Sequence, residues 1–153
     1  MRTHYRFDHA WQLDAAPEAV LALLEDLSGY GAWWPAVRVA GGSPDAGART
    51  AHLEVRAPLS YRLRITLAED AHEGGGERLP HELRAAISGD LQGWCAWRVE
   101  PEGVGTRVAF VQEVQVRQRV LRALSPLLHG ALARQHGAVM RSAEAGMRRA
   151  LGA

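Results

Sequence analysis

The sequence predicts an α+β fold in which a curved antiparallel sheet of about seven strands packs against one long C-terminal helix. Three observations support this fold: a strand pattern at residues 5–13, a series of strand patterns from 51 to 116, and helical periodicity from about 120 to 151. Helices that follow a run of strands usually cover one face of an antiparallel sheet. We expect residues 1–153 to form a single domain.

The first strand alternates between large and polar residues, as a half-buried strand does. A short helix is predicted next, because Pro17 suits a first helical turn and Glu18 is favourable near a helix N-terminus. Its apolar stripe consists of Val20, Leu23, Leu24 and Leu27, and the apolar face of the preceding strand consists of Tyr5, Phe7, His9, Trp11 and Leu13.

An aromatic segment, residues 26–35, follows this helix, and we call it the aromatic corner. It contains Tyr30, Trp33, Trp34 and Pro35. The residue before a proline is pushed out of the α region, so a helix is expected to end here. We expect this corner to close one end of a cavity, with Trp33 on the cavity side and Trp34 on the packing side.

Strand patterns fill the middle of the chain. Alternating apolar residues predict strands at 51–56, 61–67, 82–87, 95–99 and 108–116. Glycine-rich turns are expected at 41–44, 73–76 and 101–105. This spacing indicates an antiparallel meander with one apolar face.

The last 30 residues change to steps of three and four, which predicts a helix long enough to cross the sheet. Ser125-Pro126 is expected to start this helix or to kink it. Because a curved sheet around a helix is not filled by helix side chains alone, an apolar cavity is expected between them. The helix presents Leu124, Leu128, Leu132, His136, Val139, Met140, Ala143 and Met147 on one face.

The order of these segments resembles the helix-grip superfamily, often labelled SRPBCC, which includes START-related lipid-transfer domains, pollen-allergen-like proteins and polyketide cyclase/dehydrase-like proteins. The resemblance extends over essentially the whole chain and implies a helix-grip fold that binds a small hydrophobic ligand. It rests on residues 5–11, 17–20, the aromatic corner, Ser88–Gly93 with Trp97, residues 105–108 and residues 136–140.

Several kinds of chemistry are excluded or disfavoured by composition. All 18 basic residues are arginine, so a Schiff-base lysine and a phosphate-loop lysine are absent. The single Cys95 reads as a core residue, and the histidine spacings fit no metal motif, so we expect no metal and no cofactor. No apolar run approaches the roughly 20 residues of a membrane span, which favours a cytoplasmic protein without stable membrane insertion.

Charge suggests little about partners. Seven arginines and one acidic residue, Glu144, lie between 117 and 149. A solvated outer helix face is the favoured explanation over nucleic-acid binding, because basic residues interleaved with aromatics are missing. We therefore expect no nucleic acid partner.

Polar residues on apolar faces are the candidate chemical groups. His9, Gln112 and His136 each lie on a face that is otherwise apolar, so each is either paired within the protein or available to a ligand. If the protein is an enzyme, His9 or His136 would be the general acid/base, and Tyr61 would donate a hydrogen bond to an enolate oxygen.

Three functions follow, in order of preference. The first is binding or transport of a small hydrophobic molecule, such as a lipid, polyketide or aromatic metabolite. The second is a polyketide aromatase/cyclase-like activity, and the third is docking to a protein or membrane through the basic helix. The cavity is expected to be lined by Phe7, His9, Trp33, Leu53, Tyr61, Leu63, Ile87, Trp97, Gln112, His136 and Met140.

Overall fold

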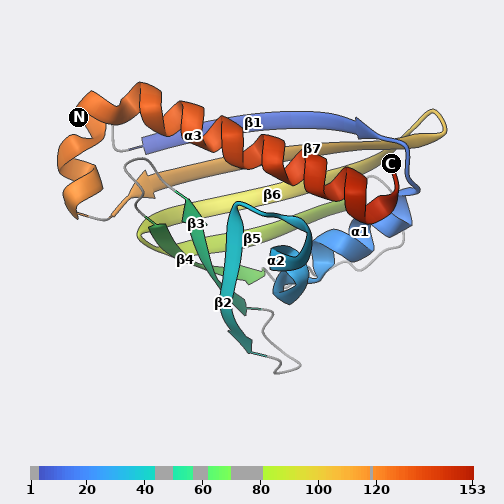
Figure 1. Ribbon diagram of the computed structural model, residues 1–153, viewed down its shortest axis with the longest axis horizontal. Coiled ribbons are helices and arrows are strands. Elements are labelled where there is room, and N and C mark those ends of the chain that lie inside the picture. Colours follow the sequence, from blue (N-terminus) through green and yellow to red (C-terminus); the bar gives the residue numbers. More distant parts are fainter. Residues whose placement is uncertain (1–3, 44–49, 57–61, 70–80, 118) are drawn as a thin grey trace.

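A computed structural model describes residues 4–43, 50–56, 62–69, 81–117 and 119–153; within these ranges the side chains of 40–43, 81, 120–122 and 124–129 are outside the description. Figure 1 shows a curled sheet crossed by one long helix. In chain order the elements are β1 (His4–Leu13), α1 (Pro17–Glu25), a 3₁₀ turn (Leu27–Gly29), α2 (Tyr30–Trp33), β2 (Val37–Ser43), β3 (Thr50–Arg56), β4 (Arg62–Glu69), β5 (His81–Gly89), β6 (Leu91–Glu102), β7 (Gly105–Val116) and α3 (Arg119–Leu151).

The seven strands form one antiparallel sheet in the order β1-β7-β6-β5-β4-β3-β2. Only β1 leaves sequence order, because it pairs with β7 at one edge. Helix α3 lies across the concave face, while α1 and α2 lie near its C-terminal end (Figure 1). The predicted helix-grip α+β fold is confirmed.

One local expectation needs correction, and the structure decides between the two alternatives for Ser125-Pro126 in favour of a kink. Residues 41–43 belong to β2 and pair with 50–52 of β3 after a register shift between Val39 and Gly41, so backbone pairing outweighs the turn preference of the glycines. Helix α3 begins at Arg119, which places Pro126 in its interior. The first turns of α3 lie at an angle to the rest (Figure 1), as an internal proline produces. The predicted turn at 73–76 lies outside the described residues.

The Ser88–Gly93 segment forms the tight connection between β5 and β6. Gly89 has φ of +105°, and a Cβ at this position would lie 2.6 Å from the carbonyl oxygen of Arg64. Asp90 also binds the backbone of Arg64, because its carboxylate accepts a hydrogen bond from the Arg64 N–H at 2.8 Å. The segment therefore needs glycine for its backbone angle and for the close approach of β4.

The aromatic corner is fastened to α3 by backbone and side-chain contacts. The indole N–H of Trp34 donates to the carbonyl oxygen of Val139 at 2.9 Å, and the backbone N–H of Ala36 donates to Ser142 Oγ at 3.3 Å. Gly146 allows the closest approach, since a Cβ there would overlap the carbonyl oxygen of Trp33. These contacts fix the C-terminal half of α3 at one end of the sheet.

The two adjacent tryptophans provide a matched test of this packing. Among the residues that the structure describes, none hydrogen-bonds the buried indole nitrogen of Trp33, whereas the indole nitrogen of Trp34 is paired with α3. Phenylalanine removes a similar volume at either position, but only Trp34→Phe removes a hydrogen bond, and Trp33→Phe removes an unpaired donor. We expect urea unfolding to show that Trp34→Phe costs about 1–3 kcal/mol more stability than Trp33→Phe. Equal costs would contradict this assignment.

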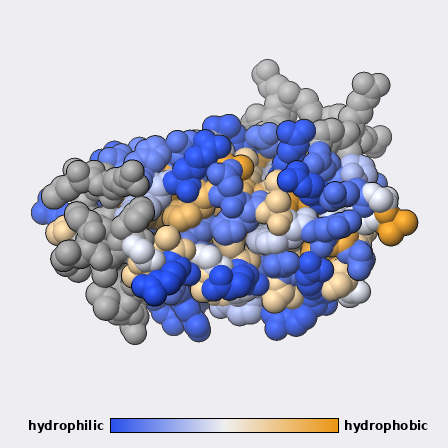
Figure 2. All heavy atoms as spheres, turned by 90° about the horizontal axis from the view of Figure 1, so that it is seen from above, coloured by the Kyte–Doolittle hydropathy of each residue, from blue (hydrophilic) through white to orange (hydrophobic). Residues whose placement is uncertain are grey.

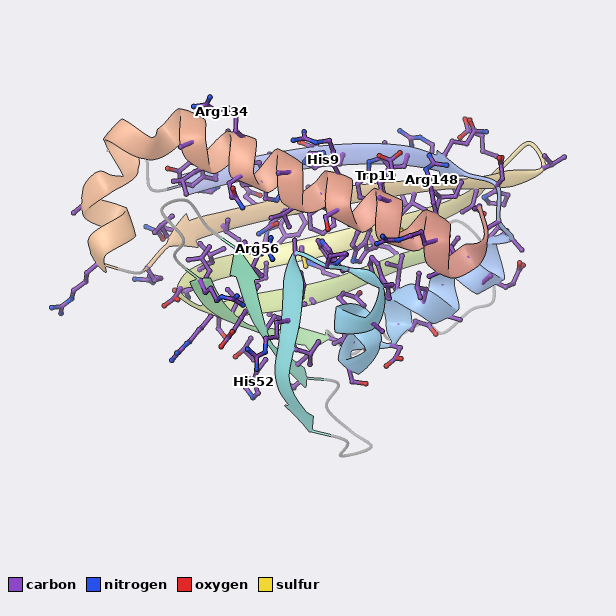
Figure 3. All side chains as sticks on the ribbon, in the orientation of Figure 1. His9, Trp11, His52, Arg56, Arg134 and Arg148 are labelled. Atoms are coloured by element: carbon purple, nitrogen blue, oxygen red, sulfur yellow. The ribbon has the colours of Figure 1, made fainter. Side chains whose placement is uncertain are left out.

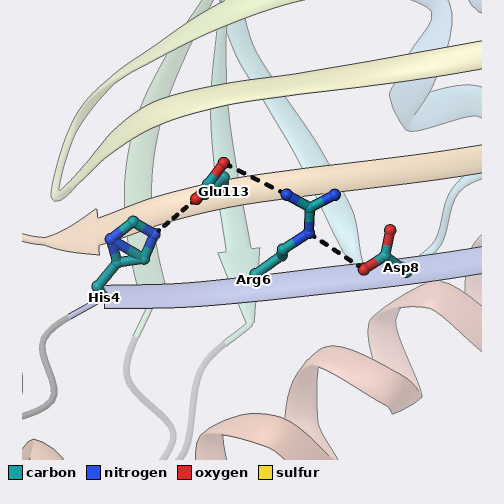
Figure 4. Close-up of polar contacts among 4 residues, drawn as sticks. All are labelled: His4, Arg6, Asp8 and Glu113. Atoms are coloured by element: carbon teal, nitrogen blue, oxygen red, sulfur yellow. Dashed lines mark hydrogen bonds and ion pairs between the residues drawn. The ribbon is translucent and has the colours of Figure 1, made fainter.

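The outer face of the sheet at β1 is charged. His4 Nε2 lies 3.1 Å from Glu113 Oε1, Arg6 Nη1 lies 3.7 Å from Glu113 Oε2, and Arg6 Nε lies 3.4 Å from Asp8 Oδ2 (Figure 4). Exposed pairs of this kind contribute little to stability. Their charges keep the edge strand β1 hydrophilic, which opposes pairing with another chain.

Figure 2 shows a mainly hydrophilic face with small groups of hydrophobic atoms between the polar ones. On α3, Arg134 and Arg149 are exposed, whereas Arg148 donates to the carbonyl oxygen of Gln12 at 2.9 Å and to Glu144 at 3.0 Å. Docking through the basic helix stays a prediction. Among the described helices, none combines the length and hydrophobicity that crossing a membrane requires.

Candidate functional site

A cavity of about 120 Å³ lies between the concave face of the sheet and α3. It is lined almost entirely by apolar and aromatic side chains from the strands, the aromatic corner and α3. An engineered apolar cavity of about 150 Å³ is large enough to bind benzene. The cavity therefore suits a molecule of about one aromatic ring.

Eight of the eleven residues expected at the cavity lie on its wall. Strand alternation and the three- and four-residue helix steps account for these placements, because both patterns specify which side chains face the interior. The eight are Phe7, Leu53, Leu63, Ile87, Trp97, Gln112, His136 and Met140.

Two expected residues lie elsewhere, and one is outside the described residues. Trp34, not Trp33, lines the cavity, which reverses our expectation for the aromatic corner. Helix α2 ends at Trp33, and Trp34 adopts extended angles of φ −109° and ψ 93°, so the two rings are set by different backbone geometry. His9 does not line the cavity; it lies where β1 packs against α3 (Figure 3). Tyr61 is outside the described residues.

Further lining residues were not predicted from the sequence. Phe110 and Val114 share the inner face of β7 with Gln112, so the same alternation could have identified them. Tyr30 and Cys95 also line the cavity. The Tyr30 hydroxyl donates to the carbonyl oxygen of Leu24 at 2.6 Å, and burial raises the pKa of this hydroxyl above its usual value, so it stays neutral.

Three polar side chains from β1, α3 and β7 are hydrogen-bonded in series beside the cavity. His9 Nε2 lies 3.3 Å from His136 Nδ1, and His136 Nε2 lies 3.0 Å from Gln112 Oε1. The His136 ring stacks on Phe7 with ring centroids 3.6 Å apart and 7° between the planes. The structure thus joins all three polar residues identified in the sequence, although only Gln112 and His136 reach the cavity.

Both histidines are held neutral. Burial is the main cause that lowers the pKa of His136 to about 3, and the nearby His9 lowers it further. Burial also lowers the pKa of His9, although the carboxylate of Asp8 opposes this shift. At neutral pH these rings therefore act as uncharged hydrogen-bonding groups.

A second pair of polar residues lines the cavity between β3 and α3. Gln135 Nε2 donates to the backbone carbonyl oxygen of Arg56 at 3.4 Å. Both residues contribute to the cavity wall, and Arg56 is exposed (Figure 3). This contact links the end of β3 to α3 on the solvent side of the cavity.

Comparisons with known proteins agree with this geometry. The chain is similar in structure to a protein from Thermus thermophilus, with a TM-score of 0.72, 18% identity, and coverage of 95% of this chain and 94% of that one. It is also similar to the Zhui aromatase/cyclase from Streptomyces sp. R1128, with a TM-score of 0.66, 14% identity and 96% coverage of both chains. A START superfamily protein from Mycobacterium smegmatis has a TM-score of 0.54, 14% identity and coverage of 89% of this chain and 97% of that one.

At such low identity these similarities establish the fold alone. No curated protein matches the sequence. The family model for polyketide cyclase / dehydrase and lipid transport matches residues 4–152, which is nearly the whole chain. The predicted resemblance to SRPBCC and START-like proteins is confirmed, and the chain belongs to the polyketide cyclase/dehydrase and lipid transport family.

Proposed function

We propose that this protein binds one small hydrophobic molecule, of about the size of a substituted aromatic ring, in the cavity beneath α3. The observation that carries this proposal is an apolar cavity of about 120 Å³ whose wall holds only a few polar side chains. Cavities with this composition are typical of binding sites for apolar ligands. A lipid chain or a multi-ring polyketide would require the cavity to widen.

Catalysis of the polyketide cyclase type is a second candidate, favoured by the presence of His136 at the cavity wall. A general base works best when its pKa lies near the working pH. Because the pKa of His136 is about 3, its ring is a weak base at neutral pH. We therefore propose binding ahead of catalysis. Cyclisation of a poly-β-keto substrate that His136→Ala abolishes would reverse this order.

Filling the cavity tests the binding proposal. Leu63 lines the cavity on β4, and its neighbour Arg64 is exposed on the opposite face of the same strand. We expect Leu63→Trp to weaken binding of α-methylstyrene, measured by calorimetric titration, at least tenfold, because the larger ring occupies the space of the ligand.

Arg64→Trp is the matched control and should bind α-methylstyrene as the unmodified protein does. If Leu63→Trp prevents folding, Val114→Phe fills the same cavity with a smaller change. Unchanged affinity in a folded cavity-filling variant would contradict the proposed function.

A further inference from the structure

We propose that the chain from His9 through His136 fixes the side-chain amide of Gln112 with its N–H₂ group toward the cavity, so that the site selects ligands carrying a carbonyl oxygen. This inference rests on the proposed function and specifies its ligand class as small aromatic ketones, aldehydes or esters. A ligand of the same shape without a hydrogen-bond acceptor would bind more weakly than the carbonyl ligand, although it is the more hydrophobic of the two.

The direction of the hydrogen bonds follows from the atoms that meet. A carboxamide oxygen only accepts hydrogen bonds, so the contact at 3.0 Å requires His136 Nε2 to carry the hydrogen. A neutral imidazole has one donor and one acceptor, so His136 Nδ1 then accepts from His9 Nε2 at 3.3 Å. His9 therefore donates to His136, and His136 donates to Gln112, which lines the cavity.

Packing keeps this chain in one arrangement. His136 is stacked on Phe7 on one side, and Phe110 lies nearly parallel at 6.4 Å between ring centroids. Protonation of His136 would place a second hydrogen on Nδ1, but this ring stays neutral far below pH 7 because its pKa is lowered to about 3. The ring is therefore neither free to turn nor charged under ordinary conditions.

The hydrogen-bonding group of Gln112 that remains unused is its N–H₂ donor. Its oxygen is occupied by His136, and within the described part of the chain its amide nitrogen makes no hydrogen bond. This nitrogen is also not one of the fully buried unpaired atoms, so it keeps some accessible surface. Because Gln112 lines the cavity, we place this surface on the cavity side. A donor in an apolar cavity is costly when unpaired, so a ligand carbonyl that accepts from it gains affinity.

Two other polar side chains of the cavity wall have donors that are already engaged. Tyr30 donates its one hydroxyl hydrogen to the backbone of Leu24, and Gln135 donates one of its two amide hydrogens to the backbone of Arg56. Of the two glutamines on the cavity wall, Gln135 is tied to β3, whereas the amide nitrogen of Gln112 has no partner within the described residues.

Two ligands of nearly identical shape test the inference. Acetophenone carries a carbonyl oxygen where α-methylstyrene carries a methylene group, so the ratio of their affinities isolates the hydrogen bond from apolar burial. We expect Gln112→Leu to lower the acetophenone preference at least tenfold, measured by titration calorimetry at neutral pH. Gln115→Leu, the same substitution at an exposed glutamine of the same strand that does not line the cavity, should leave this ratio unchanged.

Nitrogen-15 NMR of the histidine rings provides a readout that a merely structural role would not move. At neutral pH we expect His136 to show a protonated Nε2 and an unprotonated Nδ1. The opposite tautomer, or an affinity ratio unaffected by Gln112→Leu, would overturn the inference while leaving the proposed function intact. Failure of both ligands to bind would instead refute the proposed function.

Discussion

Replacing Gly146 with alanine is expected to destabilise the fold by about 3 kcal/mol. A Cβ at this position would overlap the carbonyl oxygen of Trp33 and lie 2.8 Å from its carbonyl carbon. Both atoms are backbone and cannot turn aside as a flexible side chain can. The helix and the aromatic corner must therefore separate, which also disturbs the bond from Trp34 to Val139.

Gly130→Ala in the same helix is the control. Gly130 is exposed, and a Cβ there would meet nothing within 4 Å. Alanine is favoured over glycine inside a helix by about 1 kcal/mol, so this variant should be slightly more stable than the unmodified protein. In urea unfolding, the free energy of unfolding should fall for Gly146→Ala and rise slightly for Gly130→Ala. Stabilisation by Gly146→Ala would show that α3 does not depend on this close approach.

The stability of the protein is expected to fall by about 2 kcal/mol between pH 7.5 and pH 5 through His136 alone. In the folded state the pKa of His136 is lowered from 6.5 to about 3, so the ring takes up no proton in this range. The unfolded chain does take up a proton there. Stability therefore rises with pH between about 3 and 6.5, is complete above 6.5, and is lost as the pH falls below it.

His136→Phe separates this effect from other titrating groups. Phenylalanine retains a flat ring against Phe7 but has no proton to bind. The free energy of unfolding, measured in urea at several pH values, should depend less steeply on pH in the variant by about 2 kcal/mol over this interval. Identical slopes for the two proteins would mean that His136 is protonated in the folded state or that its burial is lost in solution.

The order and type of the elements could be predicted from the sequence because they depend on local patterns. Alternation in β1 and β7 and the three- and four-residue steps of α3 specify which side chains face inward. The same kind of alternation is sufficient to assign Leu53, Leu63 and Ile87 to the cavity wall. The β2 strand was harder to predict from the sequence, because its second half is glycine-rich and pairs with β3 after a register shift.

The placement of adjacent aromatic rings could not be predicted in the same way. Trp33 and Trp34 are both large and buried, and neither periodicity nor composition distinguishes them. The choice depends on where α2 ends and on the approach of Gly146 in a helix that is distant in sequence. Such a choice is made by packing, not by local preference.

The sequence by itself determined the helix-grip fold, the apolar face of each long element, and the three polar residues that interrupt those faces. Only the tertiary structure decided that His9, His136 and Gln112 are hydrogen-bonded in series, and that His9 does not line the cavity. The physical reason is distance along the chain. His9 and His136 are 127 residues apart, so their contact exists only once α3 lies across the edge of the sheet.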